Sequence, residues 1–99
     1  MKTLTGKQRQ FLKGLAHPLS PIVRVGKGGV TEAVIAETRK SLDSHELIKV
    51  RIDVDEGAER RTLADRLATA ADAQLAGTVG KIAILYRERD EEPEIKLPK

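Results

Sequence analysis

The sequence lacks cysteine and has only two aromatic residues, Phe11 and Tyr86. Without cysteine the chain can form no disulfide and has no thiolate for a metal, which fits a reducing compartment. With so few aromatic rings it cannot build the platform on which proteins that read single-stranded nucleic acids stack bases. It also has no apolar run long enough for a signal peptide or a membrane span. We therefore expect a soluble, cytoplasmic protein.

Carboxylates are missing from the first 31 residues, and the first acidic residue is Glu32. This segment holds six basic residues, whereas the remainder holds twelve basic and fifteen acidic ones. Such an uneven distribution favours a surface that meets a polyanion. An ordinary solvated surface whose charges happen to be uneven is the simpler explanation. The charge distribution alone therefore favours a nucleic-acid partner only weakly.

A chain of 99 residues corresponds to one domain, which we expect to span residues 1–99. The predicted core covers residues 4–87, and residues 88–99 form a charged C-terminal segment. Residues 87–94, which overlap the end of the core, should be solvated, and residues 95–98 should fold back onto the body.

A first helix is predicted over residues 5–16, with Thr5 and Gln8 in the positions of a capping box. At about 100° per residue, its apolar residues fall on one side. These are Leu4, Phe11, Leu12 and Leu15. The opposite side is polar and basic, and carries Arg9, Gln10, Lys13 and His17.

The next elements alternate between strands and helices. A short strand over residues 22–25 leads into a glycine-rich turn, and Thr31 caps a helix that runs to about Ser44. The inner side of this second helix should hold Val30, Val34, Ile35, Thr38 and Leu42. Residues 47–54 alternate apolar and polar side chains, which predicts a strand with one buried and one wet face.

A third, alanine-rich helix is predicted over residues 58–75, with Gly77 marking its end. Its buried side should hold Leu63, Leu67, Ala70, Ala71 and either Gln74 or Leu75. A stub of strand at residues 78–79 and a last strand over residues 82–86 follow, joined by Gly80 and Lys81. Strands joined by helices should be parallel and the last two antiparallel. The sequence thus predicts an α/β fold, with three helices and a mixed four-stranded sheet.

Gly26-Lys27-Gly28-Gly29 lies at the junction between the first strand and the second helix. Glycines let a ligand approach the backbone closely, and a helix N-terminus presents free N–H groups to an anion. A tight turn alone can require a glycine, but three in four positions exceed that need. The motif therefore favours phosphate binding. Neither a P-loop nor a Rossmann fingerprint is completed by the residues that follow.

Arg9, Lys13 and His17 should extend this positive surface, together with Arg24, if the first helix packs beside the turn. For any one of them an ordinary solvated position is the simpler explanation. We expect no metal site, because His17 and His45 have no spacing that links them to carboxylates in a metal pattern.

Catalytic constellations and cofactor motifs are absent from the sequence. Its serines, at positions 20, 41 and 44, lie in no nucleophile motif. Asp53, Asp55, Glu56 and Glu59 cluster around a turn, where hydrophilic residues are expected. A metal-dependent nuclease could use such a cluster, but no second cluster completes the site. We expect neither an enzyme nor a cofactor.

Four segments together resemble the CRM domain family, in particular the stand-alone bacterial proteins of the YhbY type. The segments are Lys13-Gly14-Leu15-Ala16-His17-Pro18-Leu19, Val25-Gly26-Lys27-Gly28-Gly29-Val30-Thr31, His45-Glu46-Leu47-Ile48-Lys49-Val50 and Ile84-Leu85-Tyr86-Arg87. KH domains also carry a GxxG motif, but there it joins two helices rather than a strand and a helix. The alanine-rich third helix and the acidic residues near Glu91 are mild departures from the family.

The resemblance implies a fold similar to the C-terminal domain of translation initiation factor three. It also implies RNA binding through the GxxG loop, and a role as an assembly factor on precursors of the large ribosomal subunit. The RNA-binding residues we expect are Arg9, Lys13, His17, Arg24, Gly26, Lys27, Gly28, Gly29 and Thr31. The alternatives are a protein-interaction module that docks on a ribosomal protein or another acidic partner, and, with little support, a small hydrolase.

Overall fold

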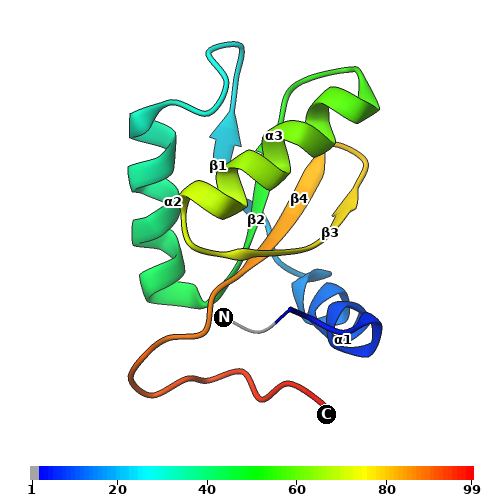
Figure 1. Ribbon diagram of the computed structural model, residues 1–99, viewed down its shortest axis with the longest axis vertical. Helices are drawn as coiled ribbons and strands as arrows, with labels where there is room; N and C mark the ends of the chain where they lie inside the picture. The colour runs from blue at the N-terminus through cyan, green and yellow to red at the C-terminus, as the bar shows by residue number, and fades with distance from the viewer. Residues whose placement is uncertain (1–2) are drawn as a thin grey trace.

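The computed structural model describes residues 3–99, which form one sheet with helices on both of its faces (Figure 1). The helices are α1 (Gly6–Ala16), α2 (Glu32–His45) and α3 (Gly57–Ala70). The strands are β1 (Pro21–Val25), β2 (Leu47–Ile52), β3 (Gln74–Val79) and β4 (Ile82–Tyr86). The strand order is β1-β2-β4-β3, with β1 parallel to β2 and β4 antiparallel to both of its neighbours. The predicted α/β fold with a mixed four-stranded sheet and three helices is confirmed.

The two faces of the sheet carry separate apolar clusters, because side chains alternate along each strand. The larger cluster lies under α2 and α3 and includes Val25, Leu42, Val50, Leu67 and Leu85. The smaller lies under α1 and includes Leu4, Leu12, Leu47, Ile84 and Tyr86. In Figure 1, α1 lies low beside the sheet, and the turn after β1 lies at the top. Thus α1 covers only the half of its face that is farther from the glycine turn.

The capping box of α1 forms as predicted: Gln8 N–H donates to Thr5 Oγ1 and Thr5 N–H to Gln8 Oε1. The predicted apolar side is only half right. Leu4 and Leu12 are buried, as is Ala16, which we did not predict. Phe11 and Leu15 were expected inside but are 39% and 41% exposed. The helix faces the sheet with Leu12 and Ala16, so Phe11 and Leu15 lie on its flank.

The strand predicted over residues 47–54 ends at Ile52 as β2. Its second face is not wet throughout, because Leu47 is only 6% exposed and packs with α1. Two residues farther on, Lys49 is partly covered, and Arg51 is exposed. One face of a single strand therefore passes from buried to open as it leaves the shelter of α1.

The predicted end of the third helix is wrong. The helix ends at Ala70, and Asp72 adopts the left-handed backbone conformation (φ +57°) that lets Ala73 N–H bond back to Ala68 C=O. Gln74, Leu75 and Gly77 consequently lie in β3, a strand expected only at residues 78–79. Aspartate tolerates the left-handed region better than most residues, so this helix needs no glycine to end.

The C-terminal segment folds back onto the body, as predicted for residues 95–98. Ile95 and Leu97 pack on the cluster beneath α1, and Gln8 Nε2 donates to the Pro98 carbonyl. The expectation of a solvated stretch before them is only partly right, because Glu46 anchors it. The Glu46 carboxylate is almost fully buried and accepts three backbone N–H groups, those of Arg89, Glu94 and Ile95.

Glu46 also ends α2, in the left-handed conformation (φ +54°), and its carbonyl accepts the N–H of Arg87. Burial alone would raise the pKa of its carboxyl, but the hydrogen bonds from the three backbone N–H groups outweigh burial and lower the pKa. One ionised side chain therefore fixes the position of the whole segment after β4.

Candidate nucleic-acid interface

The glycine loop, Gly26–Gly29, forms a tight turn directly after β1, at the top of Figure 1. Gly29 N–H donates to Gly26 C=O at 3.0 Å, and Thr31 N–H donates to Gly29 C=O at 3.1 Å. These two bonds close the loop onto itself. Thr31 then caps α2, because its hydroxyl accepts the N–H of Val34 at 3.2 Å.

Several N–H groups at the loop remain open. Those of Lys27, Gly28 and Val30 donate to no acceptor within residues 3–99. The start of α2 adds the partial positive charge of a helix N-terminus. The Lys27 side chain is exposed and has no ion-pair partner among the same residues. The loop thus combines open donors, a dipole and an unpaired cation, which suits a phosphate.

Only one glycine of this loop is required by its backbone. Gly29 has φ +75°, in the left-handed region that disfavours other residues. A Cβ added at Gly26 would meet nothing within 4 Å, and one at Gly28 would meet only Thr31 Cγ2, at 3.6 Å. The fold would therefore accept a side chain at Gly26 or Gly28. The absence of side chains at these positions instead leaves room for a ligand to approach the backbone.

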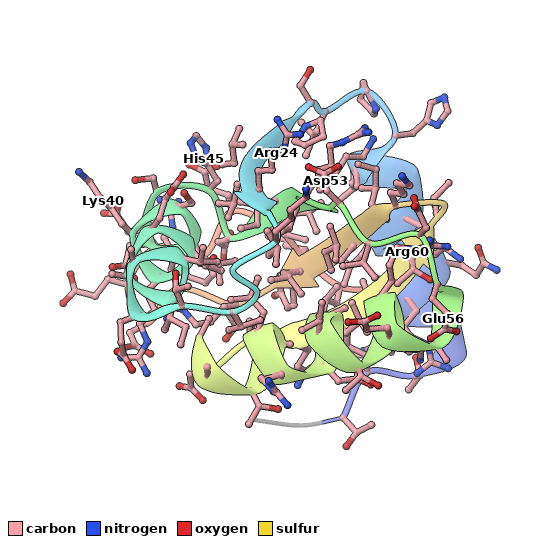
Figure 2. The ribbon with its side chains drawn as sticks, turned by 90° about the horizontal axis from the view of Figure 1, so that it is seen from above. Arg24, Lys40, His45, Asp53, Glu56 and Arg60 are labelled. Carbon is pink, nitrogen blue, oxygen red and sulfur yellow. The ribbon has the colours of Figure 1, made fainter. Side chains whose placement is uncertain are left out.

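A basic sheet face, defined here as Arg24, Lys49 and Arg51 with Asp53, lies between the loop and α1. Arg24 and Arg51 are aligned on neighbouring parallel strands, and Lys49 precedes Arg51 by two residues on the same side of β2. Figure 2 shows Arg24 next to Asp53 near the end of β1. The backbone joins this face to the loop, because Asp53 N–H donates to the carbonyl of Val25, just before Gly26.

Asp53 binds two arginines at once. Its carboxylate accepts the Nε–H of Arg24 on one oxygen and the Nε–H of Arg51, at 2.7 Å, on the other. The hydrogen bonds from Arg24 and then Arg51 lower the pKa of the Asp53 carboxyl. Each guanidinium keeps its Nη groups for another acceptor. One carboxylate therefore binds two guanidinium groups, and the three side chains together keep a net positive charge.

The three RNA-binding residues predicted on or beside α1 lie in different surroundings. Lys49 Nζ donates to the carbonyl of His17 at 3.1 Å, which places the exposed His17 beside the basic sheet face. The Lys13 stem lies against Gly77 on β3, where an added Cβ would come within 3.1 Å of it. Arg9 lies one helical turn before Lys13 on α1, and its guanidinium donates to the Leu4 carbonyl.

The first helix therefore does not lie beside the glycine loop, and the sheet face separates the two. Lys49, Arg51 and Asp53 complete the surface between them and were missed as site residues. The alternation of residues 47–53 did predict that they share one face of a strand. It could not reveal that α1 leaves this part of the face open.

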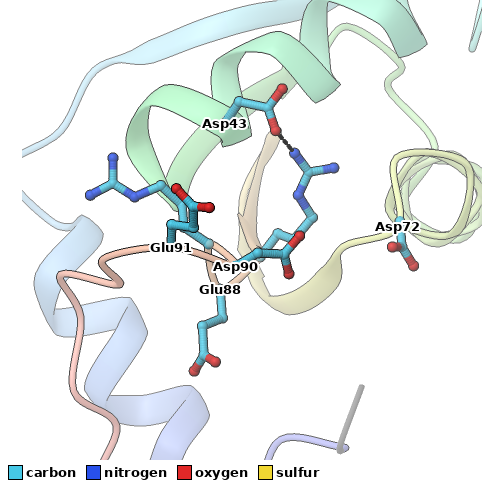
Figure 3. A pocket seen from close by; sticks show the side chains of 7 residues that line it. Asp43, Asp72, Glu88, Asp90 and Glu91 are labelled. Carbon is cyan, nitrogen blue, oxygen red and sulfur yellow. Dashed lines mark hydrogen bonds and ion pairs between the residues drawn. The ribbon is translucent and has the colours of Figure 1, made fainter.

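A cavity of about 650 Å³ lies at the other end of the molecule, around the segment that follows β4 (Figure 3). Two arginines and five carboxylates line it. The carboxylates are those of Asp43, Asp72, Glu88, Asp90 and Glu91. This acidic surface would repel a polyanion. The two ends of the molecule therefore carry charges of opposite sign, positive at the glycine loop and negative at the cavity.

Within residues 3–99, no group of three or more histidines and carboxylates is arranged to hold a metal ion. None of the helices in this range is long and apolar enough to cross a membrane.

The sequence matches a known family over most of its length. The model of the CRS1/YhbY (CRM) domain family matches residues 4–87. The chain belongs to this family. The CRM domain is 45% identical to a Haemophilus influenzae protein named RNA-binding protein, over 100% of this chain and 99% of the relative. It is 40% identical to the YqeI protein of Bacillus subtilis, which carries the name probable RNA-binding protein, over 96% and 99% of the two chains.

The fold of this CRM domain is also found in a solved structure. A hypothetical protein of Staphylococcus aureus, SAV1595, described as an RNA-binding candidate, has a TM-score of 0.87 and 38% sequence identity. The match covers 97% of this chain and 100% of the other. The relatives thus support the fold and connect the family with RNA binding.

Proposed function

We propose that this CRM domain is a non-catalytic, cytoplasmic RNA-binding protein that grips phosphate with its glycine loop. The observation that carries the proposal is the set of open N–H groups at Lys27, Gly28 and Val30, beside an unpaired lysine. The names of the relatives agree with RNA as the ligand.

The basic sheet face extends the grip from the loop towards α1. Arg24 and Arg51 offer the donors that Asp53 leaves free, and Lys49 and His17 follow beside them. Lys13 lies farther on, against β3 at the opposite edge of the sheet. Thr31 contributes indirectly, by capping the helix whose N-terminus supports the loop. Arg9, which is bonded to Leu4 C=O, would contact RNA only at the far margin.

The natural RNA of this proposal is that of a large-subunit precursor, on which the protein acts as an assembly factor. Support for this step comes from the family resemblance alone. Crosslinking from Lys27 in cells, followed by sequencing of the attached RNA, tests it. Recovery of ribosomal RNA is the expected result, and its absence among the crosslinked RNAs would remove the ribosomal part of the proposal.

The loop assignment is tested by Gly28→Asp. The fold should remain intact, because the site has room for a side chain and its backbone is not left-handed. The added carboxylate would repel phosphate at the open donors, so RNA binding should be lost. Thr62→Asp, on the exposed side of α3, adds the same charge away from the loop and should bind almost normally. A folded Gly28→Asp protein with wild-type affinity contradicts the assignment.

The alternative function is a protein-interaction module. The acidic cavity does not suit the acidic partner expected from the sequence, but it would suit a basic segment of a partner protein. This alternative predicts a partner protein that stays bound after nuclease treatment, and an RNA affinity that depends weakly on salt. Phosphate-dominated binding predicts instead a steep, linear fall of log K with log salt.

A further inference from the structure

Each cation between the glycine loop and α1 contacts a neighbouring polar group of the sheet or of the α1 end. Asp53 holds Arg24 and Arg51 through one oxygen each. Lys49 Nζ donates to the carbonyl of His17 at 3.1 Å. The supporting elements are strands of one sheet and a helix packed on it. These contacts favour one arrangement of the positive charges on the rigid sheet.

Neither of the two aromatic side chains in residues 3–99 lies beside these cations. Tyr86 is only 3% exposed and belongs to the cluster beneath α1. Phe11 is two residues from Lys13, about 200° around the helix, and so it lies on the opposite flank of α1. A single-stranded RNA would find cations here but no platform for its bases.

We propose that the RNA bound by this surface is double-helical, and that Asp53 is a positioning residue that holds Arg24 and Arg51 as one unit against its phosphate backbone. The proposal rests on the RNA-binding function proposed above and specifies the class of RNA. One favoured arrangement of charges suits a rigid phosphate backbone. A flexible strand would lose conformational freedom on such a surface, with no stacking to offset the loss.

The RNA class is tested by competition against the whole protein. One competitor is an RNA hairpin with a stem of about 16 base pairs, the length that a double-stranded RNA-binding domain spans. The other is an unstructured uridine oligomer, used at the same phosphate concentration. We expect the hairpin to compete about tenfold better, which corresponds to about 1.4 kcal/mol.

Salt separates a fitted surface from simple charge density. A duplex carries more charge per unit length, and this alone favours it at low salt. A preference that comes from the arrangement of the charges should persist as salt rises from about 50 to about 200 mM. Equal competition by the two RNAs, or a hairpin preference that vanishes over this range, overturns the proposal. Failure of both RNAs to bind overturns the RNA-binding function itself.

The role of Asp53 is tested by Asp53→Asn, with Asp65→Asn as the matched control. Each variant removes one negative charge, but Asp65 lies on α3, on the far side of the sheet, where its one ion-pair partner within residues 3–99 is Arg61. In Asp53→Asn, single-strand binding should tighten while the hairpin preference falls about threefold. In Asp65→Asn the preference should stay unchanged. An unchanged preference in both variants overturns the positioning role of Asp53.

Discussion

The two ends of the long axis of this CRM domain use their arginines in opposite ways. Near the glycine loop, one carboxylate, Asp53, serves two arginines. At the other end each arginine has a carboxylate of its own, Asp43 for Arg87 and Glu94 for Arg89. Further carboxylates around the cavity in Figure 3 remain in excess there. The first end is therefore left positive and the second negative, although both are built from similar ion pairs.

The difference shows how the fold turns an uneven sequence into an uneven surface. The acid-free N-terminal segment supplies the loop and β1, and the parallel strand β2 adds Lys49 and Arg51 beside them. The acidic C-terminal segment is held at the far end of α2 by Glu46. A polyanion would meet attraction at one end and repulsion at the other, which favours a single orientation of approach.

The largest expected effect comes from breaking the negative end at its anchor, with Glu46→Ala. The variant leaves three N–H groups without their acceptor and should lower the free energy of unfolding by about 3 kcal/mol in denaturant titrations. Glu94→Ala is the control, because its exposed side chain makes one surface ion pair, with Arg89, in the described part of the chain. It should change stability by less than about 1 kcal/mol. Equal losses in the two variants would contradict the anchoring role.

The same anchor predicts a dependence on pH. The folded pKa of Glu46 lies below its unfolded value, so its contribution is complete above the unfolded pKa of about 4.3. It is lost as pH falls through the folded pKa. Unfolding titrations should show stability declining with acidification in this window. In Glu46→Gln the decline should be less steep, because that variant has no carboxylate to protonate at this position.

The next effect concerns the positive end. Arg51→Ala should weaken RNA binding about tenfold at low salt and make the slope of log K against log salt shallower by about 0.7 to 0.9, as expected for one phosphate contact. Arg61→Ala removes the same charge from α3 and should leave the slope almost unchanged. The comparison between the two ends would fail if both variants reduced the slope alike.

A smaller effect separates backbone need from ligand contact within the loop. Gly29→Ala forces a residue with a Cβ into the left-handed region and should cost about 1 kcal/mol of stability. Gly26→Ala should leave stability nearly unchanged, because its site is open. Thermal or denaturant unfolding of the two variants measures the difference. A larger loss in Gly26→Ala would mean that the loop needs that glycine for its shape.

The smallest effect is expected from the acidic segment. Neutralising Glu91 and Glu92 by substitution with glutamine should tighten RNA binding by less than about threefold at low salt. The gain should disappear near physiological salt, where charges farther apart than about 8 Å are screened from each other. Titrations at two salt concentrations check this. A larger gain that resists salt would indicate that the acidic segment touches the RNA.

Several features of the fold could be predicted because they depend on neighbouring residues. The capping box at Thr5, the cap at Thr31 and the turn at Gly80 are local patterns that form as expected, and the alternation in β2 holds from Ile48 to Ile52. The third helix could not be bounded in this way. Its end depends on a left-handed aspartate, which is less common than a glycine, and on the pairing of residues 74–79 with β4.

The candidate site was predictable to a similar degree. The glycine loop and its lysine are visible as a motif, because the chemistry lies in consecutive residues. The basic sheet face is not, since Arg24 and Arg51 come together only when β1 and β2 pair. Nor could the buried state of Glu46 be foreseen, because its three partners follow it by more than forty residues.

The order of the elements, the mixed sheet, the glycine loop and the unequal charge of the two parts of the chain could all be predicted from residue patterns. Long-range packing sets where α1 lies, which half of the sheet face stays open, and which carboxylates are shared or buried. The two groups of features differ in the range of the interactions that produce them. Caps, turns and alternation are set by contacts between close neighbours, whereas the open face and the Glu46 anchor arise from packing between segments far apart in the chain.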